Sequence, residues 1–194
     1  MSPSSAVSAR TPSSVTEFLF IRHGEAFVNV NDLAFGNRES PLTANGVNQV
    51  LALEEELAPY KALPAAVSTY RRAKETAAVA GFTYPAVDRL LDESELDPAI
   101  FDWSDINQPM DKHVQERWIP LETLWRASTI VNRIQLGDHP YRVNFTHGLF
   151  IAGILMVCEI AGIETNYPFD PVRGYVPLRA QIVRIEIPVH DPPE

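Results

Sequence analysis

Two short apolar segments, each followed by a histidine and a glycine, constrain the fold of this chain most strongly. Residues 17–21 read EFLFI and run into RHG, and residues 142–145 read RVNF and run into THG. Short apolar runs of this kind are typical of buried strands in a parallel sheet. Ligands of such sheets gather at the carboxyl ends of the strands. The pattern therefore predicts that His23 and His147 lie at a binding edge.

The rest of the chain alternates predicted strands with predicted helices. Further strands are expected at 65–67, 84–87 and 180–187, and helices at 43–57, 71–80, 121–134 and 149–160. This order predicts an α/β fold: a three-layer sandwich with a mostly parallel central sheet flanked by helices, in one domain over 16–194. Residues 1–15, rich in serine and proline, are expected to form a flexible tail. Residues 97–120 hold three prolines and are expected to form a small lid insertion.

Composition excludes several classes of protein. The formal net charge is −9, which argues against a nucleic-acid-binding domain and against an anionic membrane surface as partner. The most apolar stretch, 148–163, is shorter than the roughly 20 residues that a membrane span needs. A single cysteine, Cys158, excludes an internal disulfide. We expect a cytoplasmic protein, and the composition does not decide its oligomeric state.

The residues around the first histidine suit phosphate chemistry. Arg22 offers planar paired donors to a phosphate, and Gly24 allows a ligand to approach the backbone closely. His23 could act there as a general base, a metal ligand or a nucleophile. His147 begins a predicted helix, and a helix N-terminus favours anions. These residues predict an anion site and leave the role of His23 open.

Five motifs, in order along the chain, resemble those of the histidine phosphatase superfamily, in its phosphoglycerate-mutase-like branch. Residues 22–29 match RHGExxxN, with Asn29 at its asparagine, and 40–49 are similar to a segment with PLTxxGxxQ. Residues 68–77 (STYRRAKETA) resemble SPLxRAxQTA, which aligns the family arginine with Arg72. The last two matches are 91–93 with LxE and 145–148 with the second-histidine element. The resemblance covers nearly all of the chain after the tail.

The resemblance implies a catalytic mechanism and a set of roles. His23 would attack phosphorus and form a phosphohistidine, and Glu93 would protonate the leaving oxygen and then activate water. The donors to the phosphoryl oxygens would be Arg22, Asn29, Arg72 and His147. The implied substrate is a small phosphorylated molecule, with no metal and no cofactor. The implied activity is hydrolysis of phosphate monoesters.

Several alternatives stay open at this point. The glycine and tryptophan that often follow the family acid are missing, since the chain continues Ser94-Glu95-Leu96, so Asp92 or Glu95 could replace Glu93 as the acid. A mutase, which returns the phosphoryl group to its substrate, and a non-catalytic phosphate-ligand-binding protein are the alternative functions. Two histidines and a glutamate could also bind zinc, but HExxH is absent and two arginines would repel the ion.

Overall fold

The computed structural model describes residues 14–30, 37–94, 119–165, 167 and 178–189. Within them lies a five-stranded sheet in the order β3-β2-β4-β1-β5. Its strands are β1 (Ser14–Arg22), β2 (Ala65–Val67), β3 (Ala86–Val87), β4 (Val143–Thr146) and β5 (Ile182–Val189). All neighbouring pairs are parallel except β1 with β5, which are antiparallel. The predicted mostly parallel sheet is confirmed.

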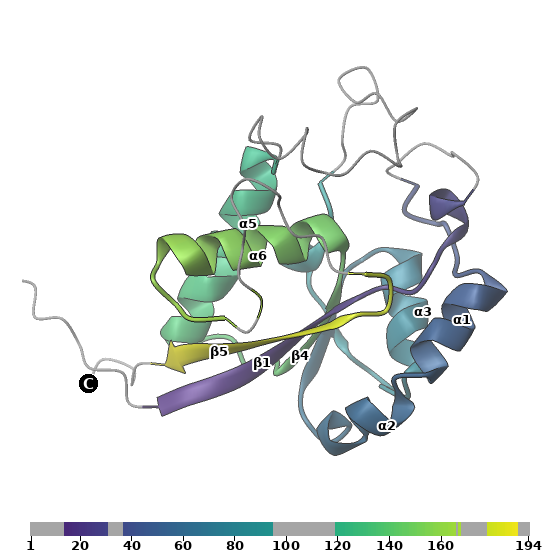
Figure 1. The fold of residues 1–194 in the computed structure, drawn as a ribbon, viewed down its shortest axis with the longest axis horizontal. Coiled ribbons are helices and arrows are strands. Elements are labelled where there is room, and N and C mark those ends of the chain that lie inside the picture. The colour runs from purple at the N-terminus through teal and green to yellow at the C-terminus, as the bar shows by residue number, and fades with distance from the viewer. Residues whose placement is uncertain (1–13, 31–36, 95–118, 166, 168–177, 190–194) are drawn as a thin grey trace, which may run out of the picture.

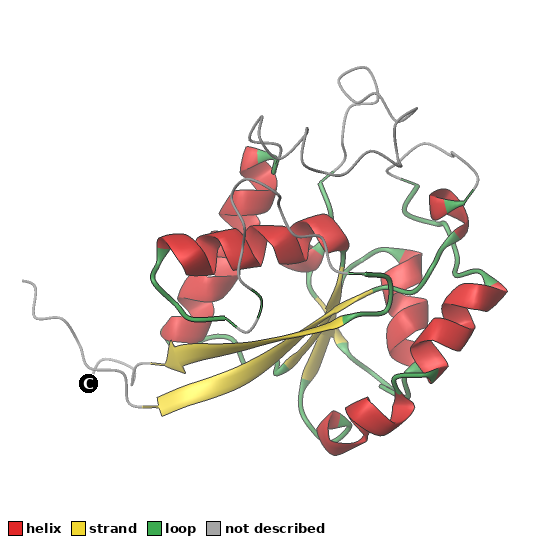
Figure 2. Ribbon diagram, in the orientation of Figure 1, coloured by secondary structure: helices red, strands yellow, loops and turns green. Residues whose placement is uncertain are grey.

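Helices cover both faces of this sheet. They are α1 (Ala44–Leu51), α2 (Glu54–Leu57), α3 (Arg71–Val79), α5 (Leu121–Gln135) and α6 (Gly148–Ile160). Helices α5 and α6 lie on one side, and α1, α2 and α3 lie on the other (Figures 1 and 2). The three-layer α/β sandwich predicted from the sequence is therefore confirmed. Among the described residues, no helix combines the length and the apolar character needed to cross a membrane.

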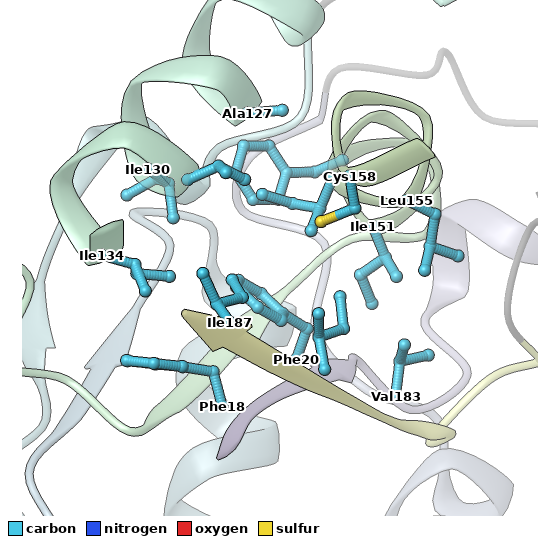
Figure 3. Packing of buried hydrophobic residues seen from close by; sticks show 14 of the residues in the cluster. Phe18, Phe20, Ala127, Ile130, Ile134, Ile151, Leu155, Cys158, Val183 and Ile187 are labelled. Atoms are coloured by element: carbon cyan, nitrogen blue, oxygen red, sulfur yellow. The ribbon is translucent and has the colours of Figure 1, made fainter. Parts of the chain in front are cut away.

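Strand β1 joins the two halves of the core because it is buried on both faces. Phe18 and Phe20 pack with α5, α6 and β5 in one apolar cluster (Figure 3). Leu19 and Ile21 point the other way and pack with α1 and α3. Full burial of an apolar side chain of this size contributes about 1.5–3 kcal/mol relative to leaving it exposed. Burial on both faces explains the continuous apolar run in the sequence.

The segment predicted as one helix over 43–57 is divided in two. Thr43 caps α1 as expected, since its Oγ1 accepts the Gly46 N–H at 3.0 Å. The first helix ends where the N–H of Leu53 bonds to the carbonyl of Val50 at 3.0 Å, in a tighter i to i−3 pattern. Three consecutive glutamates, 54–56, then occupy the first turn of α2, where the helix dipole favours negative charge.

Some predicted boundaries differ from the observed ones. Strand β1 begins at Ser14, where it pairs with Val189, so its first two residues fall in the segment predicted as a tail. Residues 1–13 and 97–118, which include most of the expected tail and lid, lie outside the described residues. The strand expected at 84–87 is reduced to Ala86–Val87. Both strands nevertheless keep their places in the sheet.

Candidate active site

Three neighbouring parallel strands end at one place and bring polar side chains together there. The N–H of His23, after β1, donates to the carbonyl of Thr146 at 3.1 Å, and His147 follows Thr146 at the end of β4. The N–H of Ser68, after β2, donates to the carbonyl of Phe145 at 3.0 Å. The two imidazole rings lie with their centroids 5.2 Å apart. The sheet register therefore places His23, Ser68 and His147 side by side.

The hydrogen bonds of His23 define its tautomer. Nδ1 lies 2.7 Å from the carbonyl oxygen of Gly24, which can only accept, so Nδ1 carries the proton. Nε2 consequently keeps its lone pair, and it accepts the Nε–H of Arg72 at 3.0 Å. Burial, together with the charges of Arg72 and Arg22, holds the pKa of His23 well below the usual range of a histidine. His23 is thus a buried neutral imidazole with a lone pair facing the site.

Arg72 links the nucleophile candidate to the acid candidate. It is the second residue of α3 and is buried. One terminal nitrogen donates to Oε2 of Glu93 at 3.2 Å, and the other donates to the carbonyl of Asn37 at 3.2 Å. Its neighbour Arg71 is half-exposed and pairs with Glu75 at 2.7 Å on the outside of the helix. The structure thus brings Arg72, and not Arg71, to His23.

Glu93 reaches the site from the turn after η3 (Arg89–Leu91). Its Oε2 lies 3.7 Å from Nδ1 of His147, and its Oε1 accepts the N–H of Leu149 at 3.3 Å, in the first turn of α6. Asp92, the alternative acid, is buried and directed to Ser68 and Thr69 instead. Of the three acid candidates, Glu95 lies outside the described residues, and only Glu93 of the other two contacts both Arg72 and His147.

His147 is completely buried at the start of α6. Its Nε2 lies 2.8 Å from Oγ of Ser68, and the ring of Tyr70 packs edge-on against it at a centroid distance of 4.8 Å. Burial, followed by the charge of Arg72, lowers the pKa of His147 well below that of a free histidine. A bound dianionic phosphoryl group would act in the opposite direction and favour the protonated ring.

Two further predicted phosphate ligands lie at the end of β1 and just after it. Arg22 is the last residue of β1, and burial is the main cause that lowers the pKa of its guanidinium, on which the charges of Glu93, Arg179 and Arg72 also act. Asn29 closes a short 3-10 turn, where its Oδ1 accepts the N–H of Ala26 at 3.0 Å. This bond gives Asn29 a role in shaping the turn, and its role as a phosphate ligand stays a prediction.

Comparison with known proteins identifies the family. A family model described as "Histidine phosphatase superfamily (branch 1)" matches residues 18–166. The chain belongs to this superfamily. A comparison with curated proteins gives no match.

Solved structures of other histidine-phosphatase-like proteins share the fold. A phosphoserine phosphatase mutant from Entamoeba histolytica, in complex with phosphoserine, is 15% identical with a TM-score of 0.63, covering 87% of this chain and 89% of that one. A phosphoglycerate mutase from Thermus thermophilus is 24% identical with a TM-score of 0.60, covering 90% and 95%. A mycobacterial glucosyl-3-phosphoglycerate phosphatase in complex with VO3 is 21% identical with a TM-score of 0.57, covering 91% and 92%.

The structure brings further residues to this candidate site that the sequence motifs did not assign. Ser68 and Tyr70 contact His147 from the segment that resembles SPLxRA, and the motif held a signal for Ser68, whereas Tyr70 stands where the motif has leucine. Arg179 forms an ion pair with Glu25 at 2.8 Å, next to the segment that follows His23. No motif accompanies Arg179 in the sequence, and only the folded chain brings it to the site.

Three side chains of the candidate site could also form a metal-ligand set. One ligand atom from each of His23, Glu93 and His147 can be chosen so that all lie within 4.8 Å of one another. The guanidinium of Arg72, however, donates to His23 Nε2 and Glu93 Oε2. A cation at this place would face that positive charge and would compete for the same lone pairs. The donor arrangement suits an anion such as a phosphoryl group better than a metal ion.

Proposed function

We propose that this histidine phosphatase family member hydrolyses phosphate monoesters, without a metal, through a phosphohistidine on His23. The observation that carries the proposal is the tautomer of His23: Nδ1–H is held by the Gly24 carbonyl, and the Nε2 lone pair faces Arg72. A neutral imidazole is the form that can attack phosphorus. The neighbouring guanidinium would stabilise the charge on the phosphoryl oxygens during that attack.

The first half-reaction transfers the phosphoryl group to the enzyme. Nε2 of His23 forms a bond to phosphorus as the bond from phosphorus to the leaving oxygen breaks. Glu93, in its protonated form, gives its proton to that oxygen, so the product leaves as an alcohol. Arg22, Arg72 and protonated His147 would donate to the phosphoryl oxygens. Positioning and charge stabilisation of this kind are the main contributions that proteins make to phosphoryl transfer.

The second half-reaction releases inorganic phosphate. Glu93, now ionised, takes a proton from a water molecule as the water oxygen attacks phosphorus. The bond between Nε2 and phosphorus breaks, and the neutral imidazole of His23 is restored. The position of Glu93, 3.2 Å from Arg72 and 3.7 Å from His147, supports its use as the acid in one step and the base in the next.

A phosphotransferase of the mutase type is the second candidate, because a phosphoglycerate mutase is among the structures that share the fold. The two functions differ only in the acceptor of the second half-reaction, which is water in a phosphatase and a substrate hydroxyl in a mutase. A protein that binds phosphate esters without turnover is the non-catalytic alternative. A nucleophile and an acid held beside each other favour an enzyme, since binding alone requires neither.

The test is hydrolysis of para-nitrophenyl phosphate and of a panel of small phosphorylated metabolites, in the presence of a chelator, by the wild type and by His23→Ala. The proposal predicts release of inorganic phosphate by the wild type and none above background by the variant. Phosphoryl transfer to a second metabolite without phosphate release would favour the mutase. Tight phosphate binding without any turnover would favour the binding protein, and equal turnover by both proteins would exclude His23 as nucleophile.

A further inference from the structure

A buried carboxylate lies directly behind the second histidine of the site. Asp92 accepts three hydrogen bonds, each of 2.7 Å: from the Ser68 hydroxyl, from the Thr69 N–H and from the Thr69 hydroxyl. The guanidinium of Arg38 lies 3.7 Å away. An ionised carboxylate can only accept hydrogen bonds, and this set of donors suits that form. Ser68 therefore gives its single hydroxyl proton to Asp92.

Because Ser68 donates to Asp92, the direction of its hydrogen bond with His147 is determined. Having donated to Asp92, Oγ of Ser68 can only accept, and it does so from the N–H of Tyr70 at 3.2 Å. Nε2 of His147 lies 2.8 Å from the same oxygen and must then be the nitrogen that carries the proton. A continuous chain of hydrogen bonds thus runs from His147 through Ser68 to Asp92.

The other ring nitrogen is the one that faces the reacting groups. Nδ1 of His147 is buried and has no hydrogen-bond partner among the residues that the structure describes. It lies 3.7 Å from Oε2 of Glu93. The charged or titratable groups around the ring are those of Arg22, Arg72, His23, Glu93 and Tyr70. Nδ1 is therefore available to a phosphoryl oxygen, provided that Nε2 stays bound to Ser68.

Two residues that differ from the SPLxRA motif, Thr69 and Tyr70, hold the groups of this hydrogen-bond chain in position. Thr69 occupies the proline position of SPLxRA and supplies two of the three donors to Asp92, neither of which a proline possesses. Tyr70 occupies the leucine position; its ring packs against His147, and its hydroxyl donates to the carbonyl of Glu93 at 3.0 Å. The orientation of Asp92 and His147 thus depends on side chains that differ from the SPLxRA motif.

We propose that Asp92, acting through Ser68, is a positioning residue that holds His147 in the Nε2–H tautomer with Nδ1 directed at the phosphoryl group. The role toward a phosphoryl group rests on the proposed function, whereas the tautomer of His147 is independent of it. In the Nε2–H form, Nδ1 is the atom that takes up a proton when the site binds a phosphate monoester. The resulting imidazolium donates to the phosphoryl oxygen at Nδ1 and to Ser68 at Nε2.

Nuclear magnetic resonance of ¹⁵N-labelled histidine in the ligand-free protein tests the tautomer directly. The signals of His147 are assigned by their loss in His147→Gln, and the spectra are recorded at mildly alkaline pH. We expect the wild type to show His147 as the Nε2–H tautomer, and Ser68→Ala and Asp92→Asn to show a mixture or the Nδ1–H form. An Nδ1–H tautomer in the wild type, or an unchanged Nε2–H tautomer in both variants, would overturn the proposal.

Kinetics of the same variants give a second readout. We expect Ser68→Ala and Asp92→Asn to lower kcat by about 10- to 100-fold, the range found for groups that orient metal-bound histidines. The control is Thr123→Val, which removes another fully buried hydroxyl, bonded to Ser94 at 2.6 Å, and should leave kcat and tautomer unchanged. Thr69→Val removes only the hydroxyl donor to Asp92 and replaces the other variants if they do not fold. We expect it to change kcat and the tautomer in the same direction but by less.

The two readouts separate this proposal from the proposed function. A wild type without any phosphatase activity would refute the function, and the NMR spectra would still decide whether Asp92 and Ser68 set the tautomer. An active wild type whose variants keep full kcat and the Nε2–H tautomer would refute the positioning role and leave the function intact.

Discussion

The Nε–H of Arg72 donates to Nε2 of His23 across 3.0 Å, so the lone pair assigned to attack phosphorus is already in contact with a guanidinium. The same guanidinium holds Glu93. In the proposed reaction, the Arg72 donors would bind the negatively charged phosphoryl oxygens, and the lone pair of His23 would become free to attack. Arg72 therefore contacts His23 and Glu93 in the ligand-free site and would contact the phosphoryl group during the proposed reaction.

Replacing Arg72 with lysine tests this connection. A lysine keeps the charge but loses the planar set of donors that contacts His23, Glu93 and Asn37 together. We expect kcat/KM for phosphate monoesters to fall by about 10²- to 10³-fold, as when a donor to a transition-state oxyanion is removed. The matched control is Arg71→Lys, next in the chain but half-exposed and paired with Glu75, which should retain wild-type kinetics. Equal losses in both variants would contradict the role of Arg72.

Replacing Glu93 with glutamine tests the proton donor. General acid catalysis contributes about 10²- to 10⁴-fold, and its loss should be largest for poor leaving groups. We expect phosphorylation of the enzyme by an alkyl phosphate to slow far more than that by para-nitrophenyl phosphate, whose leaving oxygen needs little protonation. Single-turnover kinetics with the two substrates measure this difference. Equal slowing with both substrates would show that Glu93 is not the acid of the first step.

Buried neutral histidines make stability depend on pH. The pKa values of His23, His147 and His139 are lowered mainly by burial, so the unfolded chain binds more protons than the folded one as pH falls below about 6.5. Stability should be constant with respect to these groups above that pH and should decrease below it. The slope is up to about 1.4 kcal/mol per pH unit for each histidine until its folded pKa is reached.

Urea unfolding at a series of pH values measures this dependence, with His139→Phe as a probe of one contribution. His139 is buried just before β4, with Nε2 3.1 Å from Oδ1 of Asn144. The variant should show a shallower decrease in the free energy of unfolding below pH ~6.5. The same decrease in the variant as in the wild type would mean that His139 does not resist protonation in the folded protein.

The contact between Gly46 and Glu25 should be intolerant of a side chain. A Cβ at position 46 would lie 2.0 Å from the carbonyl oxygen of Glu25, so the backbone that follows His23 would have to move. We expect Gly46→Ala to reduce the free energy of unfolding by about 1–3 kcal/mol or more. Asn48→Ala, at an exposed position of the same helix, is the control and should have little effect. Thermal and urea unfolding of both variants check the difference.

The sequence was sufficient for the main features of the fold and for predicting that most of the candidate site residues lie together, for identifiable physical reasons. Strand β1 is apolar on both faces because it is buried on both, and this left a continuous run that could be recognised. His23 and His147 follow strands that are neighbours in the sheet, so the general rule for parallel sheets was enough to bring them together.

Other features depended on tertiary contacts that no local pattern encodes. The choice between Asp92 and Glu93 could not be made from two adjacent carboxylates, because the turn after η3 decides which one turns toward Ser68 and which one toward Arg72. Arg179 reaches Glu25 from a segment 154 residues away in the chain. The break between α1 and α2 also went unpredicted, since the apolar spacing continues across it.

The proposed mechanism requires a covalent phosphohistidine on His23, and trapping this intermediate tests it most directly. The wild type is mixed with a phosphate monoester, quenched with alkali within one turnover, and analysed by mass spectrometry of its peptides under conditions that preserve phosphohistidine. We expect one phosphoryl group on His23 in the wild type, more of it in Glu93→Gln with para-nitrophenyl phosphate, and none in His23→Ala. Turnover without any phosphorylated peptide, or with the phosphoryl group on another residue, would contradict it.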